Sequence, residues 1–165
     1  MQVLLDELCP FDRCIREVKY GAQGKSRIDL LLSSGGTAVP PANKRARTFH
    51  EGDRRVYVEV KSTTLVQNRD GTPVGMFPDA VTTRGLKHLQ ELIGEVRNGH
   101  RAAMVYVVQR PDVEVFSAAE HIAPAYAEGF REALANGVEA YAIRCRMKKG
   151  GIEAVARVPI DVSRS

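Results

Sequence analysis

The sequence predicts an α/β fold with a mixed β-sheet, and three of its features carry that prediction. One central segment alternates between apolar and polar residues, two others are short apolar runs, and two more have helical periodicity. The chain of 165 residues is long enough for one domain and short for two. A mixed sheet with helices packed on its faces is the simplest arrangement for these elements.

The first half of the chain is predicted to contain one short helix and three strands. Residues 2–8, "QVLLDEL", form the helix, and residues 14–21, "CIREVKYG", form the first strand. The second strand spans residues 27–32 and is nearly all apolar, which is typical of a strand buried on both faces. The third strand lies within residues 54–64, "RRVYVEVKSTT", where three valines alternate with Tyr, Glu and Lys.

The second half is predicted to contain two helices and three strands. Residues 82–100 carry leucines at helical spacing. Five polar side chains are expected on the exposed surface of that helix: Arg84, Lys87, His88, Glu91 and Glu95. A buried strand follows at residues 102–109, and a second helix covers about residues 124–136. Residues 138–147 and 152–158 are strands joined by a hairpin turn at "KKGG".

Two segments between these elements read as loops. Residues 67–75, "QNRDGTPVG", contain an Asp-Gly pair and are predicted as a turn region. Residues 33–55 open with Ser, Gly and Pro and are longer than most connections in compact domains. Lys44, Arg45 and Arg47 charge this loop, which is either a solvated loop or an arm that lies along phosphates.

Composition limits the classes of protein. The net charge of +4 permits an anionic partner without requiring one. The cysteines are odd in number and lack metal-site spacing, so we expect reduced thiols in a cytoplasmic protein. The longest apolar run, residues 102–108, is far too short to cross a bilayer, and the N-terminal residues lack the basic region of a signal peptide. We therefore expect no membrane association.

Two acids stand inside apolar strands, Asp29 in "RIDLLL" and Glu59 in "YVEVKS". A buried carboxylate without a partner is costly, so each needs a compensating group. One solution is a pair of salt bridges, with Arg27 and Lys61 as partners. The other is a divalent cation that both carboxylates share. The residues alone leave both solutions open.

The spacing of Glu59 and Lys61 suits the cation. Side chains two apart in a strand project from the same face, and the carbonyl of Val60 lies between them as a further oxygen ligand. Mg²⁺ needs only one or two protein carboxylates, and Mn²⁺ accepts similar ligands. Lys61 cannot bind a cation, but it could orient or help deprotonate an attacking water, or neutralise charge in a phosphoryl transition state.

Four segments, in order, resemble the sugar fermentation stimulation protein family. They are "SRIDLLL", "YVEVKSTTL", "FPDAVTTRGLKHLQELI" and "AAMVYVVQRPDVEVFS", and the resemblance runs from about residue 6 to residue 159. It implies a nuclease-like domain with a restriction-endonuclease-like PD-(D/E)xK core of order α-β-β-β-α-β. The elements predicted above follow that order, with a C-terminal helix and hairpin added.

The resemblance also implies roles for individual residues. Asp29, Glu59 and Lys61 match the catalytic motif, and Mg²⁺ or Mn²⁺ is implied at Asp29, Glu59 and Val60. Glu7 falls where the first helix of the fold often adds an acid. The helix segment implies nucleic-acid contacts, which join those expected of the charged loop: Arg84, Lys87, His88, Lys44, Arg45 and Arg47. Gln109 is expected near the site, at the end of the fourth strand.

The sequence departs from the family pattern in three respects. Ile28, rather than proline, precedes Asp29, and the literal Pro-Asp pairs, at residues 78–79 and 111–112, come after the motif lysine. The charged loop is longer than the family pattern leads us to expect. The family usually carries an N-terminal OB-like DNA-binding barrel, and we expect this chain to form a single nuclease-like domain without it.

The leading functional hypothesis is a metal-dependent nuclease that hydrolyses phosphodiester bonds in DNA. The main alternative is a non-catalytic DNA-binding regulator of sugar metabolism genes, and a weaker one is a protein-interaction module that uses the charged loop. For the nuclease, we expect Glu59→Gln to cost activity without lowering the melting temperature, because removing one carboxylate relieves repulsion between acids.

Overall fold

The computed structural model describes residues 11, 13–21, 24–34 and 54–163. The predicted helix at residues 2–8 and most of the charged loop lie outside these residues, as do Glu7, Lys44, Arg45 and Arg47. Within the described part the architecture is mixed α/β, as the sequence predicts, with two helices and two β-sheets. Neither of those helices is long and apolar enough to span a bilayer.

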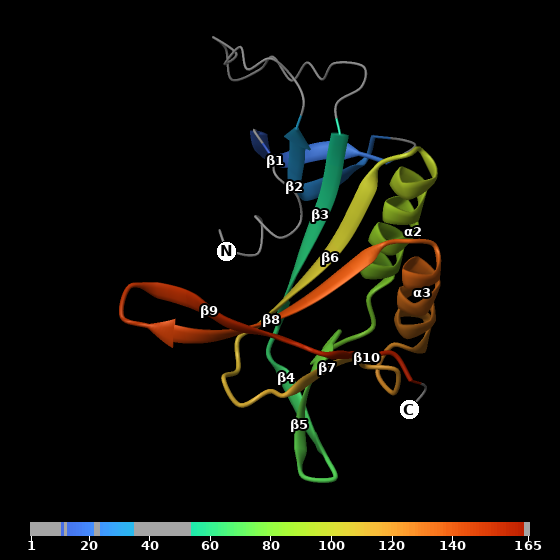
Figure 1. The fold of residues 1–165 in the computed structure, drawn as a ribbon. Coiled ribbons are helices and arrows are strands. Elements are labelled where there is room, and N and C mark those ends of the chain that lie inside the picture. Colours follow the sequence, from blue (N-terminus) through green and yellow to red (C-terminus); the bar gives the residue numbers. More distant parts are fainter. Residues whose placement is uncertain (1–10, 12, 22–23, 35–53, 164–165) are drawn as a thin grey trace.

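The larger sheet has six strands in the order β1-β2-β3-β6-β8-β9 (Figure 1). The central strands β3, β6 and β8 run parallel, while the pairs towards both edges are antiparallel. The strands are β1 Arg13–Tyr20, β2 Ser26–Ser34, β3 Arg54–Thr63, β6 Arg101–Val108, β8 Glu139–Lys148 and β9 Gly151–Val158. All six correspond to strands that the sequence predicts.

Both helices, α2 (Thr83–Arg97) and α3 (Pro124–Ala135), lie on one face of this sheet (Figure 1). Leu89, Leu92 and Ile93 turn the apolar side of α2 inwards and are at most 4% exposed. The same inward side also includes two polar side chains, because His88 and Glu95 are buried as well, at 3% and 8% exposed. The prediction that these two side chains lie on the exposed surface of the helix is therefore wrong.

The smaller sheet was not predicted. Its strands, in the order β10-β7-β5-β4, are β4 Leu65–Arg69, β5 Thr72–Phe77, β7 Val115–Ala118 and β10 Ile160–Asp161. The prediction of a turn over all of residues 67–75 is wrong, because most of them belong to β4 and β5. Only Asp70 and Gly71, with φ of 51° and 87°, form the turn of this β4–β5 hairpin. β5 then pairs in parallel with β7, which is distant in sequence, so local periodicity could not reveal the sheet.

Strand β3 separates the two hydrophobic clusters of the larger sheet. Val56 and Val58 point into the cluster on the face opposite the helices, and Tyr57 points into the main core beneath α2 and α3. Because side chains alternate along a strand, Glu59 and Lys61 share the face of Tyr57. The alternating pattern of the sequence thus directs the two polar side chains towards α2.

Candidate functional site

Glu59 is the centre of the site. Its side chain is 3% exposed, and Oε1 lies 2.6 Å from Nζ of Lys61, which is 17% exposed. The same Oε1 is hydrogen-bonded to Nδ1 of His88 on α2. The other carboxylate oxygen, Oε2, is buried and has no hydrogen-bond partner among the described residues. One oxygen is therefore held from two sides while the second remains available for a ligand.

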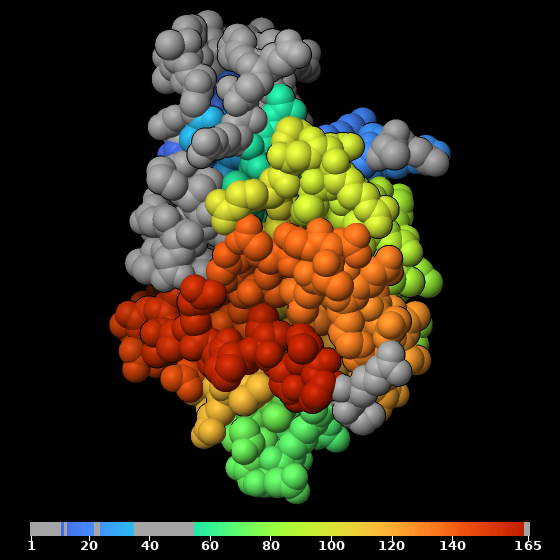
Figure 2. All heavy atoms as spheres, turned by 45° about the vertical axis from the view of Figure 1, so that its right-hand side comes forward, coloured from blue at the N-terminus to red at the C-terminus, as the bar shows by residue number. Residues whose placement is uncertain are grey.

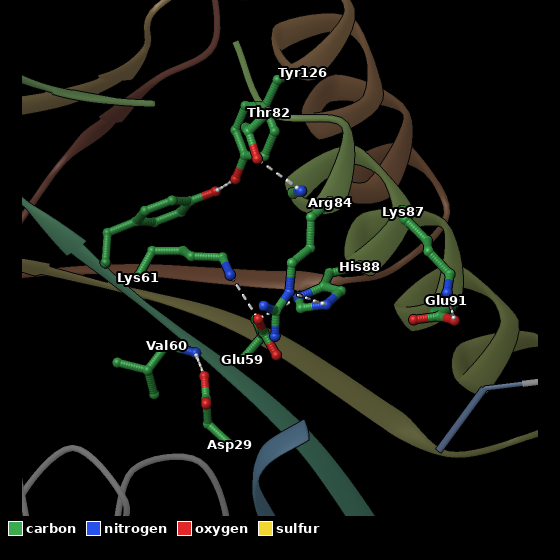
Figure 3. A network of polar contacts seen from close by, with 12 residues as sticks. Asp29, Glu59, Val60, Lys61, Thr82, Arg84, Lys87, His88, Glu91 and Tyr126 are labelled. Carbon is green, nitrogen blue, oxygen red and sulfur yellow. Dashed lines mark hydrogen bonds and ion pairs between the residues drawn. The ribbon is translucent and has the colours of Figure 1, made fainter. Parts of the chain in front are cut away.

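Arg84 extends the network along α2 (Figure 3). Its Nε lies 3.5 Å from Nε2 of His88, one helical turn away. Figure 3 shows the Arg84 side chain extending from α2 to His88, which in turn contacts the Glu59 carboxylate. Arg84 itself is exposed to solvent.

Asp29 lies where the regular pairing of β2 with β3 ends, and its side chain takes over a hydrogen bond there. The antiparallel pairing of β2 with β3 stops at Leu30–Val58, so Asp29 and Glu59 are the next residue on each strand. There the Asp29 side chain accepts a hydrogen bond from the backbone N–H of Val60, with 2.7 Å between Val60 N and Asp29 Oδ2. Since the N–H and C=O of one strand residue point to the same side, the Val60 carbonyl faces the side of Asp29.

The strand on the other side of Asp29 is also irregular. The β1–β2 pairing skips the position between Arg16–Leu30 and Val18–Ile28, where Glu17 lies opposite Asp29. Glu17 has a φ of 53°, a left-handed conformation that is uncommon for a residue other than glycine. Regular strand pairing is thus interrupted between β1 and β2 and ends between β2 and β3 at Asp29. The Asp29 carboxylate is hydrogen-bonded to the backbone of Val60 at this irregular position.

The two acids have opposite pKa shifts. Burial raises the pKa of Asp29, the hydrogen bond from Val60 opposes that rise, and the charge of Glu59 adds to it. Burial also acts to raise the pKa of Glu59, but the hydrogen bonds from His88 and Lys61 outweigh it and lower the pKa overall. Glu59 is therefore ionised at neutral pH, and its negative charge disfavours ionisation of the neighbouring Asp29.

The salt-bridge alternative holds for one acid only. Glu59 pairs with Lys61, but the described structure contains no ion pair between Arg27 and Asp29, and Arg27 is exposed. The compensating group of Asp29 is instead the backbone N–H of Val60. Asp29 therefore shares the neighbourhood of Glu59 without a cationic side chain bonded to it among the described residues.

The remaining predicted residues lie at different distances from this centre. Lys87 is 51% exposed and pairs with Glu91 on the same helix, at 3.6 Å between Lys87 Nζ and Glu91 Oε1. Gln109 follows β6 and donates to Ser62 Oγ at 2.6 Å, so it lies just past the end of β3. His88 was predicted as a nucleic-acid contact, but in the structure it is buried and forms a hydrogen bond with the Glu59 carboxylate.

Tyr20 belongs to the surroundings of the site and was not predicted. It is 5% exposed, and its hydroxyl has no partner among the described residues. Burial raises the pKa of Tyr20, and the charge of Glu59 raises it further, so the hydroxyl lies within the field of the carboxylate. No local signal marks Tyr20, because its proximity to Glu59 depends on the pairing of three strands.

The donor set limits the metals that could bind. Among the described residues, no three His, Cys, Asp or Glu side chains are grouped to hold an ion. The available oxygens are Glu59 Oε2, the Asp29 carboxylate and the Val60 carbonyl. These are hard ligands from two acids and one backbone group, which fit Mg²⁺ or Mn²⁺ with solvent completing the shell rather than a caged zinc ion.

Comparisons with known proteins agree on one family. The family model described as "Sugar fermentation stimulation protein RE domain" matches residues 2–151. Curated sugar fermentation stimulation protein homologs are similar along nearly the whole chain. The protein from Shewanella piezotolerans is 44% identical over 94% of this chain and 58% of its own length. The one from Thioalkalivibrio sulfidiphilus is 41% identical over 98% of this chain and 60% of its own length.

A solved structure supports the same relationship. The structure titled "The structure of Pyrococcus Furiosus SfsA in complex with Ca2+" superposes with a TM-score of 0.71 at 30% identity. The match covers 97% of this chain and 59% of that one. The chain thus spans about three fifths of the length of the relatives it matches. By family model, sequence and fold, the chain belongs to the sugar fermentation stimulation protein family.

Proposed function

We propose that this chain is a divalent-metal-dependent nuclease domain of the PD-(D/E)xK type, with Asp29, Glu59 and Lys61 as its motif residues. One observation carries the proposal. Two acids from different strands meet at Val60, and one of them keeps a buried oxygen, Glu59 Oε2, without a hydrogen-bond donor among the described residues. A buried carboxylate oxygen is costly unless it is satisfied, and a cation would satisfy it.

Three groups would hold the cation: the carboxylates of Asp29 and Glu59 and the carbonyl of Val60. The raised pKa of Asp29, caused by burial and then by the nearby Glu59, supports this assignment because a cation would relieve both effects. The relative from Pyrococcus furiosus is described in complex with Ca²⁺, which also prefers oxygen ligands. When bound, Mg²⁺ or Mn²⁺ would act as a Lewis acid that stabilises negative charge on a phosphoryl group.

The protein groups around Glu59 have distinct tasks in this proposal. His88 and Lys61 fix Oε1, which orients the carboxylate and leaves Oε2 directed elsewhere. The ammonium of Lys61 is partly exposed, so it can approach a phosphate and neutralise charge that develops on its oxygens. Arg84 and Lys87 are exposed on the same helix and would bind neighbouring phosphates of the nucleic-acid backbone. DNA is the proposed substrate on grounds of family resemblance.

Nicking of supercoiled plasmid DNA tests the proposal. We expect cleavage with Mg²⁺ or Mn²⁺, none with EDTA, and a loss of about 10²–10³-fold in Glu59→Ala, the scale of removing a group that stabilises transition-state charge. Glu128→Ala is the matched control, because that acid is 60% exposed on α3 and away from the network. Cleavage that persists in Glu59→Ala at the wild-type rate would reject the site.

A second candidate, a DNA-binding regulator without catalysis, is favoured by one observation. Glu59 Oε1 is already neutralised by Lys61 and contacted by His88, so part of the cluster is a self-contained ion-pair network. The same preparation distinguishes the two. Salt-dependent binding of DNA together with no nicking in Mg²⁺ or Mn²⁺ would favour the regulator.

A further inference from the structure

The β8–β9 hairpin extends well beyond the sheet from which it starts (Figure 1). β6 accompanies β8 only as far as the pair Val108–Arg144, whereas β8 and β9 stay paired up to Lys148–Gly151. From residue 145 to residue 154 the two strands therefore form a two-stranded ribbon, which we call the β8–β9 ribbon. In Figure 2 it lies at the left margin of the molecule, in dark orange and red.

The tip of the β8–β9 ribbon is strongly cationic. Arg146 and Lys148 have side chains 57% and 53% exposed, and Lys149 in the turn is exposed as well. The ribbon has a single acid, Glu153, which pairs with Arg146 at 2.9 Å and with Lys148 at 2.7 Å. Three cations thus share one carboxylate, which leaves an excess of positive charge at the tip.

The opposite face of the tip is apolar. Met147 and Ile152 are directly paired across the ribbon, so their side chains lie on the same face. They are 63% and 50% exposed, among the most exposed large apolar side chains of the described chain. A two-stranded ribbon gains little stability from such a pair in water, so the exposed pair suits contact with another molecule.

We propose that the β8–β9 ribbon binds duplex DNA beside the catalytic site, an inference that rests on the proposed nuclease function. A two-stranded ribbon fits the major groove, and cations along it can contact the phosphates on either side. The Met147–Ile152 pair then packs against sugars and base edges, which apolar side chains of DNA-binding arms commonly contact. The excess positive charge favours nucleic acid over a neutral partner.

The position of the ribbon relative to Lys61 predicts where on the duplex it binds. Lys61 pairs with Tyr106, and Tyr106 pairs with Ala142, so Lys61 and Ala142 share one row of the sheet. Lys148 is six residues further along β8, which places it about 20 Å beyond that row at ~3.3 Å per residue. At about 3.4 Å per base pair, the tip reaches a duplex some six base pairs from the cleaved bond.

Binding of a labelled duplex, measured by fluorescence anisotropy without divalent cations, tests the inference. The double variant Lys148→Ala/Lys149→Ala should bind more weakly, and the slope of log affinity against log salt should fall in magnitude by about 1.8, or ~0.9 per lost phosphate contact. Met147→Ser/Ile152→Ser should weaken binding without changing that slope. Lys19→Ala/Lys25→Ala removes the same charge from the opposite edge of the sheet, at exposed positions, and should bind as the wild type does.

The possible results separate this inference from the proposed function. Wild-type affinity and slope in both ribbon variants, with unchanged melting curves, would overturn the ribbon assignment and leave the nicking test of Glu59 unaffected. Equal loss in the Lys19/Lys25 control would also overturn it, because net charge alone would then explain binding. A change in oligomeric state in the Met147/Ile152 variant, with unchanged DNA affinity, would make the ribbon a contact between copies instead. No binding by the wild type would overturn the ribbon assignment, and the nicking test would then decide the proposed function by itself.

Discussion

The backbone N–H of Val60 donates to the carboxylate of Asp29, at 2.7 Å between nitrogen and oxygen, at the point where β2 stops pairing with β3. This contact brings Asp29 next to Glu59, a residue thirty positions later in the chain. It requires an oxygen acceptor on the side chain but no charge. Charge at Asp29 is therefore separable from its structural role by a substitution that keeps the acceptor.

Asp29→Asn should raise the melting temperature at neutral pH in the absence of divalent cations. The asparagine oxygen can still accept from Val60, and the repulsion with Glu59 disappears. The pKa of Asp29 is raised in the folded chain, chiefly by burial, so wild-type stability falls as pH rises from the ordinary value of 3.8 through the folded pKa. The advantage of the variant should therefore be complete at pH 7 and vanish below about pH 3.8, as thermal melts at several pH values would show.

Divalent cations supply the control for this substitution. Addition of Ca²⁺ or Mn²⁺ should raise the melting temperature of the wild type more than that of Asp29→Asn, because a ligand that binds only the folded state stabilises it more strongly the higher its affinity. Equal shifts in the two proteins would show that Asp29 does not bind the cation.

Glu59→Gln should lower the melting temperature, which reverses the expectation from the sequence. That expectation assumed repulsion within an acid cluster, whereas Lys61 and His88 stabilise the ionised carboxylate and lower its pKa against the effect of burial. Loss of the charge should cost about 2 kcal/mol, typical of a hydrogen bond to a charged group, or ~4–8 °C for a domain of this size.

The pH dependence of Glu59→Gln checks its cause. A lowered folded pKa contributes stability above the ordinary value of 4.5, and this contribution is lost as pH falls through the folded pKa. The difference between wild type and variant should thus be constant near neutrality and shrink in acid. A difference that stays constant down to pH 3 would point to lost packing instead of lost charge.

Local patterns predicted the elements that carry the site. The alternation of β3 identified the face shared by Glu59 and Lys61, and the leucine spacing of α2 identified the helix that covers them. Both patterns depend on neighbours within a few residues, which a sequence displays directly. The β8–β9 hairpin was predicted for the same reason, because its turn residues separate two strand-like segments.

Local patterns did not predict contacts between residues that are far apart in the sequence. In the smaller sheet the four-residue strand β7 pairs with β5 on one side and with the two-residue strand β10 on the other, and both pairings join residues far apart in sequence. His88 was placed on the surface because histidine is polar, yet it occupies the inward side of α2 beside Leu89 and Leu92. Only a buried acid on the facing strand, Glu59, makes that position favourable for a histidine.

His88→Ala and His88→Asn should differ in their effect on the site. Nδ1 of His88 contacts Glu59 Oε1, and the amide nitrogen of asparagine occupies nearly the position of Nδ1. Alanine should lower Mn²⁺ affinity by about 10–100-fold, as loss of groups that orient a metal ligand commonly does, and asparagine should restore most of it. Isothermal titration of Mn²⁺ measures both, and wild-type affinity in His88→Ala would show that His88 does not position Glu59.

Thr82→Ala should loosen the end of α2 that carries Arg84 and His88. Thr82 is the N-cap, and its Oγ1 accepts a hydrogen bond of 3.0 Å from Gly85 N. The first turn of the described helix α2 contains no acidic residue to interact with the helix dipole, so this cap is its main local stabilisation. We expect a loss of about 1 kcal/mol, with ~2–4 °C in melting temperature.

Thr82→Ser separates the cap from packing. Serine keeps the hydroxyl that accepts from Gly85 but lacks the methyl group, which lies where a side chain on Gly85 would meet it, at 2.8 Å. If the cap is responsible, Thr82→Ser should melt close to the wild type, and only Thr82→Ala should speed hydrogen exchange of the amides in the first turn. Equal destabilisation of both variants would assign the effect to the methyl group, and Gly85 would then matter for packing against Thr82 rather than as the donor to its hydroxyl.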